Sequence, residues 1–264
     1  MNLQVLVSTM HQHDHSLLEK MNIQSDAIII NQCDKNEIDE FEYKNNSIKF
    51  YSLAERGVGL SRNTAFMRAT ADICLFADDD MEYVDGYADK ILNAFIQLPD
   101  ADVIIFDIDI INKTKEISNH RRISKVMRLN IFNSMRYGAC RIAVKRERVL
   151  KSNTFYSLLF GGGAKYSAGE DSIFIRECLR KKLKIYAFPL VIAKVDDSSS
   201  TWYQGVNEKL LQDKGALLAV AFPKLFPLLF IYYGLRMKKS SRKKFNFSQI
   251  VSLFNKGRKM YYEN

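Results

Sequence analysis

The feature that most constrains this chain is an unbroken apolar run, Ile73–Ala77, followed at once by three aspartates, Asp78–Asp80. The run shows no alternation of apolar and polar residues, which is typical of a strand covered on both faces in a parallel sheet. Ligands of open α/β sheets bind beyond the carboxyl ends of such strands. The sequence therefore predicts that the three carboxylates lie in a binding crevice of an α/β fold.

Three adjacent carboxylates repel one another unless a cation shares them. A hard divalent ion, Mg²⁺ or Mn²⁺, is held by one or two carboxylates and completed by water and substrate phosphates. Arg56 and Arg62 lie just upstream, and Ser61 is a suitable N-cap for a helix whose first N–H groups would also favour an anion. Carboxylates for a metal, beside arginines and a helix start for phosphate, predict a metal–diphosphate site.

A second acidic segment, Gly169-Glu170-Asp171, follows roughly ninety residues later and precedes a helical pattern that ends in Arg180-Lys181-Lys182. Acidic residues at the start of a helix and basic residues at its end are what the helix macrodipole favours, so capping alone would explain the segment. Together with the three aspartates and the glycine-containing loop before them, we favour a functional Asp171.

The order of GVGLSRN at 57–63, a helix, LFADDD at 75–80 and GED at 169–171 resembles the donor-binding half of family 2 glycosyltransferases with the GT-A fold, of the type that assembles bacterial surface polysaccharides. The resemblance implies a nucleotide-sugar-binding and catalytic domain over 1–205, with a central, mainly parallel sheet flanked by helices. We expect a helical extension over 206–264. The length of the chain suits one such core with a small appendage.

The resemblance also implies an inverting, metal-dependent hexosyltransferase that uses a UDP-sugar. Asp171 is the expected base, which takes the proton of an acceptor hydroxyl as that oxygen attacks the anomeric carbon. Asp80 is the expected ligand of Mn²⁺ or Mg²⁺, which neutralises charge on the departing diphosphate. The expected contacts on the donor side are Thr9, Asp34, Arg56, Arg62, Asn63, Asp78 and Asp79, and those on the acceptor side are Glu170 and Trp202.

Some positions keep a second interpretation. Asp34 could accept a hydrogen bond from the imide N–H of uracil or could be a solvated turn residue. Trp202, the only tryptophan, could stack on a sugar or belong to the core. His11, His13 and His15 form an H-x-H pattern that also occurs in metal-dependent hydrolases, but the one remaining histidine of the sequence is His120, so we interpret them as loop residues.

The C-terminal part changes character. Residues 215–235 carry one charge, Lys224, with Pro223 and Pro227, and a basic cluster follows from Arg236 to Lys244. The run approaches the ~20 residues that span a bilayer, but its charge and prolines disfavour a straight span. We expect peripheral or monotopic attachment to an anionic lipid surface at the cytoplasmic face of the cell membrane. The alternative is that this segment packs on the catalytic domain.

The net charge of +9 favours anionic partners without choosing among nucleic acid, membrane and phosphorylated substrate. With the resemblance, we expect a nucleotide-sugar donor, a glycan or lipid-linked sugar acceptor and a membrane, and no nucleic acid. The four cysteines are widely spaced without a C-x-x-C motif, which favours a reduced, cytosolic chain. The N-terminus lacks the basic n-region of a secretory signal.

Two other functions stay open. A metal-dependent nucleotidyl- or phosphotransferase could also use aspartates at a strand end, but it would usually place a phosphate-binding loop after the first strand, and residues 8–14 contain no such loop. A scaffold subunit of a polysaccharide assembly complex, which keeps the fold for binding alone, is the alternative without catalysis.

Overall fold

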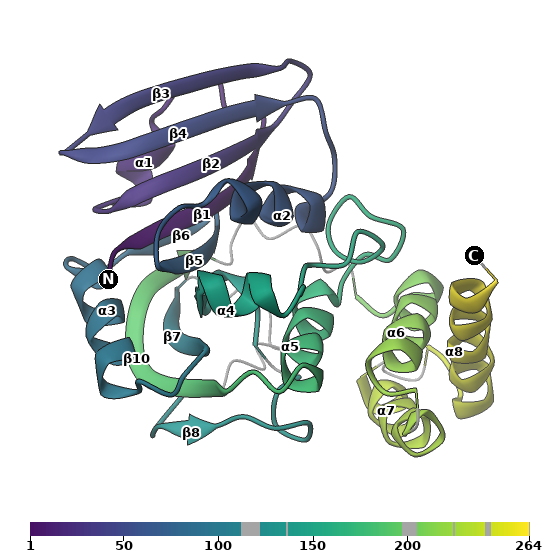
Figure 1. The fold of residues 1–264 in the computed structure, drawn as a ribbon. Helices are drawn as coiled ribbons and strands as arrows, with labels where there is room; N and C mark the ends of the chain where they lie inside the picture. The colour runs from purple at the N-terminus through teal and green to yellow at the C-terminus, as the bar shows by residue number, and fades with distance from the viewer. Residues whose placement is uncertain (112–121, 136, 197–204, 224, 241–243, 264) are drawn as a thin grey trace.

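The computed structural model describes residues 1–111, 122–135, 137–196, 205–223, 225–240 and 244–263. Its N-terminal part is built on one central sheet with helices against both faces, and its C-terminal part is a group of three helices beside it (Figure 1). This arrangement confirms the predicted α/β class, the central sheet flanked by helices and the helical C-terminal extension.

Within the described residues, ten strands pair into a single mixed sheet. In chain order they are β1 (Leu3–Met10), β2 (Asp26–Gln32), β3 (Glu37–Tyr43), β4 (Asn46–Leu53), β5 (Ile73–Asp78), β6 (Met81–Tyr83), β7 (Val103–Ile111), β8 (Met127–Arg128), β9 (Ile142–Lys145) and β10 (Ile185–Asp196). The order across the sheet is β3-β4-β2-β1-β5-β9-β7-β10-β6, and β8 pairs with β10. β4, β2, β1 and β5 are parallel neighbours, so their carboxyl ends share one edge. β9 enters antiparallel between β5 and β7.

Helices cover both faces of this sheet. They are α1 (Leu17–Lys20), α2 (Val58–Arg68), α3 (Tyr87–Gln97), α4 (Arg146–Lys151) and α5 (Glu170–Arg180), and a 3₁₀ turn, Ala139–Arg141, leads into β9. Buried side chains of α1 and α3 join the core on one face, and those of α2, α4 and α5 join the core on the other.

The central strand β5 is buried on both sides, as its apolar run predicts. Leu75 and Ala77 belong to the core on one face, whereas Cys74 and Phe76 belong to the core on the other. Successive side chains of a strand point to opposite faces, so a strand with two covered faces needs apolar residues at every position. β5 ends at Asp78, and the three aspartates therefore leave the sheet at its carboxyl edge.

The start of α2 corrects one expectation. The sequence predicts Ser61 as the N-cap, but the helix begins at Val58, directly after Gly57. Gly57 has a φ of 125°, which favours glycine, and its N–H donates to Oε1 of Gln32 at 2.7 Å. The backbone thus turns into the helix about one turn earlier. Ser61 is buried inside α2, where its hydroxyl lies 3.0 Å from that of Ser8.

The extension consists of α6 (Glu208–Ala221), α7 (Phe226–Ser240) and α8 (Phe247–Tyr262). The apolar run 215–235 is therefore split between two helices, and none of the described helices is both long and apolar enough to cross a bilayer. α6 is largely buried, and at its crossing with α8 a Cβ on Gly257 would lie only 1.8 Å from the carbonyl oxygen of Gln212. α6 therefore packs against the rest of the protein, which is the alternative to membrane attachment. Much of the surface of α7, in contrast, stays exposed.

Candidate active site

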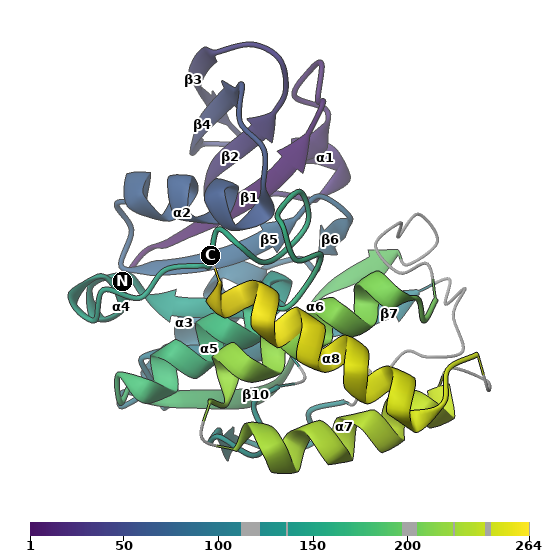
Figure 2. The same cartoon turned by 90° about the vertical axis from the view of Figure 1, so that its right-hand side faces the viewer.

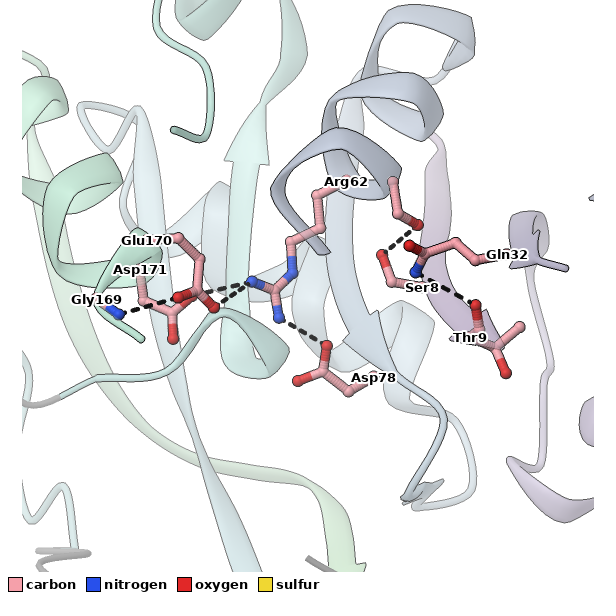
Figure 3. Close-up of polar contacts among 9 residues, drawn as sticks. Ser8, Thr9, Gln32, Arg62, Asp78, Gly169, Glu170 and Asp171 are labelled. Atoms are coloured by element: carbon pink, nitrogen blue, oxygen red, sulfur yellow. Dashed lines mark hydrogen bonds and ion pairs between the residues drawn. The ribbon is translucent and has the colours of Figure 1, made fainter. Parts of the chain in front are cut away.

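The two acidic segments meet at Arg62, which projects from α2 (Figure 3). Its Nη2 lies 2.7 Å from a carboxylate oxygen of Asp78, at the end of β5. Its Nη1 lies 2.9 Å from Glu170 and 3.1 Å from Asp171, in the first turn of α5. The Arg62 side chain is only 4 % exposed, so this ion-pair cluster is held inside the protein.

Close packing of the glycine-containing loop 161–163 on the start of α2 brings α5 to Arg62. The carbonyl oxygen of Gly162 accepts the N–H of Val58 at 2.9 Å. A Cβ on Gly161, whose φ is 107°, would approach both Val58 and Glu170, and a Cβ on Gly59 would lie 2.3 Å from the carbonyl oxygen of Ser157. These positions accept only glycine without a shift of the backbone or a side chain, which accounts for the glycines on both sides of the contact.

Asp171 has the surroundings of a strong base. Burial raises its pKa well above the usual range, the neighbouring carboxylate of Glu170 raises it further, and Arg62 opposes both effects. The Asp171 side chain is still 24 % exposed, so another molecule can reach it. A carboxylate with a raised pKa accepts a proton more readily at neutral pH, which is what general-base catalysis requires.

The first acidic segment is incompletely neutralised. Asp78 pairs with Arg62, and Asp79 accepts a hydrogen bond from Oγ1 of Thr9 at 2.5 Å. Burial raises the pKa of Asp80 to about 6, and repulsion by Asp78 and Asp79 adds to the effect. A carboxylate cluster of this kind gains most from a bound cation.

These residues fit a divalent ion that shares its coordination with a substrate. Within the described part of the chain, no group of three or more His, Cys, Asp or Glu side chains forms a ready-made metal shell. Mg²⁺ and similar hard ions need only one or two protein carboxylates when phosphates and water supply the other oxygen ligands. The hard oxygen donors of Asp78 and Asp80 suit that type of site.

Three of the predicted donor contacts gather at the same edge of the sheet. Thr9 lies near the end of β1, Asp34 follows β2, and Arg56 follows β4. The parallel register places Ser8 beside Asp78, so these strand ends adjoin the first acidic segment. Asp34 and Arg56 are exposed, and the edge therefore presents accessible charges of both signs next to the aspartates.

Several other predicted residues have partners that the sequence did not reveal. The guanidinium of Arg62 is occupied by three carboxylates, so in this structure it is not free for a phosphate. The side-chain Nδ2 of Asn63 donates to the carbonyl oxygen of Tyr156 at 2.9 Å, and its Oδ1 accepts the N–H of Tyr156 at 2.8 Å. These two hydrogen bonds hold the loop after α4 against α2. Glu170 is buried against Arg62. Trp202 lies outside the described residues.

Gln32 and Gln12 are polar residues of this edge that sequence reasoning missed. Gln32 holds the N–H of Gly57, and Gln12 donates from Nε2 to Oγ1 of Thr9 at 2.9 Å. Gln32 ends β2, beside the end of β1, so its place at a strand end was the signal that could have identified it. The ring of His15 stacks on Phe41, and its Nε2 lies 3.3 Å from Asp39, so it contacts residues of β3.

Comparison with known proteins identifies the family of this chain. Residues 15–152, slightly more than half of the chain, match the sequence model described as Glycosyl transferase family 2. A search of curated proteins gave no match.

Solved structures give the same fold. The chain is similar to S. aureus TarS 1-349 in complex with UDP-GlcNAc, with a TM-score of 0.63 and 12 % identity over 100 % of this chain and 92 % of that one. It is also similar to the same fragment in complex with UDP, with a TM-score of 0.58 and 13 % identity over the same shares of both chains. For a longer chain of S. aureus TarS, the TM-score is 0.61 at 12 % identity, over 99 % of this chain and 55 % of that one. At such low identity the likeness establishes the fold alone.

Proposed function

Since the chain belongs to glycosyl transferase family 2, we propose that it transfers a hexosyl group from a UDP-sugar to a glycan or lipid-linked sugar acceptor, with inversion at the anomeric carbon. One observation supports this proposal above the others. Arg62 joins Asp78 to Asp171, so the two acidic segments share one site although they are far apart in the sequence.

Inverting transfer needs two carboxylates with separate duties. One must stay free of the cation, because it accepts the proton of the acceptor hydroxyl while that oxygen attacks the anomeric carbon from the side opposite the diphosphate. We assign this duty to Asp171, whose raised pKa suits proton acceptance and whose exposed fraction leaves room for an acceptor. Arg62 orients Asp171 and lies between it and Asp78.

Asp80, together with Asp78, would hold Mn²⁺ or Mg²⁺, and the bound ion would neutralise charge on the departing diphosphate. The raised pKa of Asp80 supports this assignment, because a carboxylate repelled by its neighbours is stabilised by a cation. Asp79 is tied to Thr9 and keeps the turn after β5 against the end of β1.

The strand ends beside these aspartates would bind the nucleotide. Asp34 and Arg56 are both exposed there, so Asp34 would accept the imide N–H of uracil and Arg56 would contact the diphosphate. The complexes of TarS with UDP-GlcNAc and UDP support a uridine nucleotide for a chain of the same fold. The acceptor would belong to bacterial surface-polysaccharide assembly at the cytoplasmic face of the cell membrane.

The test is release of UDP by the purified protein from a panel of UDP-sugars, with Mn²⁺ or Mg²⁺ present. We expect release that depends on the metal and is lost in Asp171→Asn. Tight donor binding without release under any condition would instead favour a scaffold. Transfer of the nucleotide itself, seen in the product mass, would favour a nucleotidyltransferase.

A further inference from the structure

The net positive charge of this protein comes from its C-terminal end. From Lys214 to Tyr262 the sequence contains eleven Lys and Arg residues and no Asp or Glu. The rest of the chain holds 28 Lys and Arg against all 30 Asp and Glu, so its formal charge is −2 although the whole chain carries +9. The basic character therefore belongs to the helical extension and not to the part that carries the candidate active site.

One helix of this extension, α7, exposes an apolar stripe. Leu228, Ile231, Tyr232 and Leu235 are each 52–70 % exposed. Their spacing of three and four residues places them on one face of the helix. Figure 2 shows α7 along the lower edge of the molecule, with β3 and β4 at the opposite end. The other described helices expose large apolar side chains singly, such as Met67 on α2 and Ile96 on α3.

The opposite face of α7 explains why the stripe is not needed for folding. Phe226, Phe230 and Gly234 are buried, and they pack in the core of the extension. Packing of this buried face against α6 and α8 holds the helix in place, so the exposed stripe is free to contact another surface. Apolar side chains that are exposed together on one face of a helix typically mark an interaction site.

Cations continue the stripe at the C-terminal end of α7. Arg236, Lys238 and Lys239 are exposed in the last turns of α7 itself. The partner must therefore accept apolar side chains and supply negative charge beside them.

We propose that the outer face of α7, with the cations at its C-terminal end, docks on an anionic lipid bilayer. The four apolar side chains would enter the boundary between headgroups and acyl chains, while the cations would contact lipid phosphates. A second copy of this chain suits the face less well, because two such faces would oppose cations to cations. This assignment does not depend on the proposed transfer reaction, and it replaces the expected insertion of residues 215–235, since α6 is core.

The test is co-sedimentation of the full-length protein with vesicles of phosphatidylcholine alone or mixed with phosphatidylglycerol. We expect binding to the mixed vesicles only, with release at raised ionic strength. Ile231→Glu/Leu235→Glu and Lys238→Glu/Lys239→Glu should each weaken binding at least about tenfold, since they remove the apolar and the cationic contributions in turn.

Matched substitutions elsewhere on the surface serve as controls. Ile96→Glu replaces an apolar side chain that is 63 % exposed on α3, and Lys181→Glu/Lys182→Glu reverses two exposed charges after α5. Both should keep vesicle binding, and all variants should keep the wild-type melting temperature and its rise with UDP. The proposal is overturned if the wild type ignores both vesicle types, binds them equally, or loses binding as much in the controls. Loss of a dimer by light scattering in the α7 variants, with no vesicle binding by the wild type, would assign the face to a second copy.

Discussion

The guanidinium of Arg62 lies 3.1 Å from the carboxylate of Asp171, although the two residues are 109 positions apart in the sequence. The same guanidinium pairs with Asp78, so one buried cation holds both acidic segments of the site. Burial alone would lower the pKa of Arg62, but the attraction of Asp78 and Asp171 outweighs it and keeps the side chain charged. Arg62 therefore ties the expected base to the end of β5.

Replacing Arg62 should destabilise the protein. Arg62→Met leaves buried carboxylates without a partner, and we expect a loss of about 3–5 kcal/mol in the free energy of unfolding, the usual cost of breaking a buried ion pair. Urea unfolding followed by circular dichroism measures it. Arg68→Met, at an exposed position of the same helix, is the control and should cost no more than about 1 kcal/mol. Equal losses in the two variants would show that the cluster is not held by Arg62.

The pKa of Asp80 predicts how the stability of the metal-free protein depends on pH. Because its folded pKa of about 6 lies above its ordinary value of 3.8, the protonated form is favoured by folding. This contribution is fully present below pH 3.8 and is lost as the pH rises through about 6. Its size is at most about 3 kcal/mol.

Asp80→Asn removes that titration. In the absence of metal, the variant should therefore be more stable than the wild type near pH 7, and the difference should shrink as the pH falls toward 4. Thermal unfolding in a chelating buffer, scanned over pH, measures both effects. A difference between the two proteins that stays constant over this pH range would contradict the assigned pKa.

The close crossing of α6 and α8 predicts that replacing a glycine of α8 by alanine lowers the stability of the protein. Gly257→Ala should normally favour a helix by about 1 kcal/mol. Here the new Cβ would meet the carbonyl oxygen of Gln212 at 1.8 Å, so the helices must separate, and we expect a net loss of about 1–3 kcal/mol. Ser252→Ala, on the exposed side of α8, is the control and should be neutral or slightly stabilising. An increase in thermal stability of Gly257→Ala would show that α6 and α8 do not pack backbone to backbone.

The sequence predicted those parts of the fold that depend on local pattern. β5 was evident because a run of apolar residues without alternation needs two covered faces, and α5 because acidic and basic residues mark its ends. β3 was missed, because four of the seven residues of this edge strand are Glu or Asp and it has no apolar run. Such edge strands gain their structure from pairing, here with β4, which no local pattern reveals.

Contacts between residues that are distant in the sequence were the other part of the structure that could not be predicted. Arg62 looked like a phosphate ligand, because a sequence does not reveal which of many carboxylates will surround a given guanidinium. Similarly, residues 215–235 form one apolar run in the sequence, yet the part of the run in α6 is core and the part in α7 exposes a face. The difference arises from Gly215 and Gly257, which let α6 and α8 pack so closely that α6 is enclosed.

The central claim is that Asp171 and Asp80 share one site with separate duties. Its most direct test measures UDP-sugar binding with and without Mn²⁺, alongside transfer, in Asp171→Asn and Asp80→Asn. We predict that Asp171→Asn keeps Mn²⁺-dependent donor binding but loses at least about a hundredfold in transfer rate, as expected when a general base is removed. Asp80→Asn should lose the dependence of donor binding on Mn²⁺. Wild-type transfer by Asp171→Asn, or unchanged Mn²⁺ dependence in Asp80→Asn, would contradict the account.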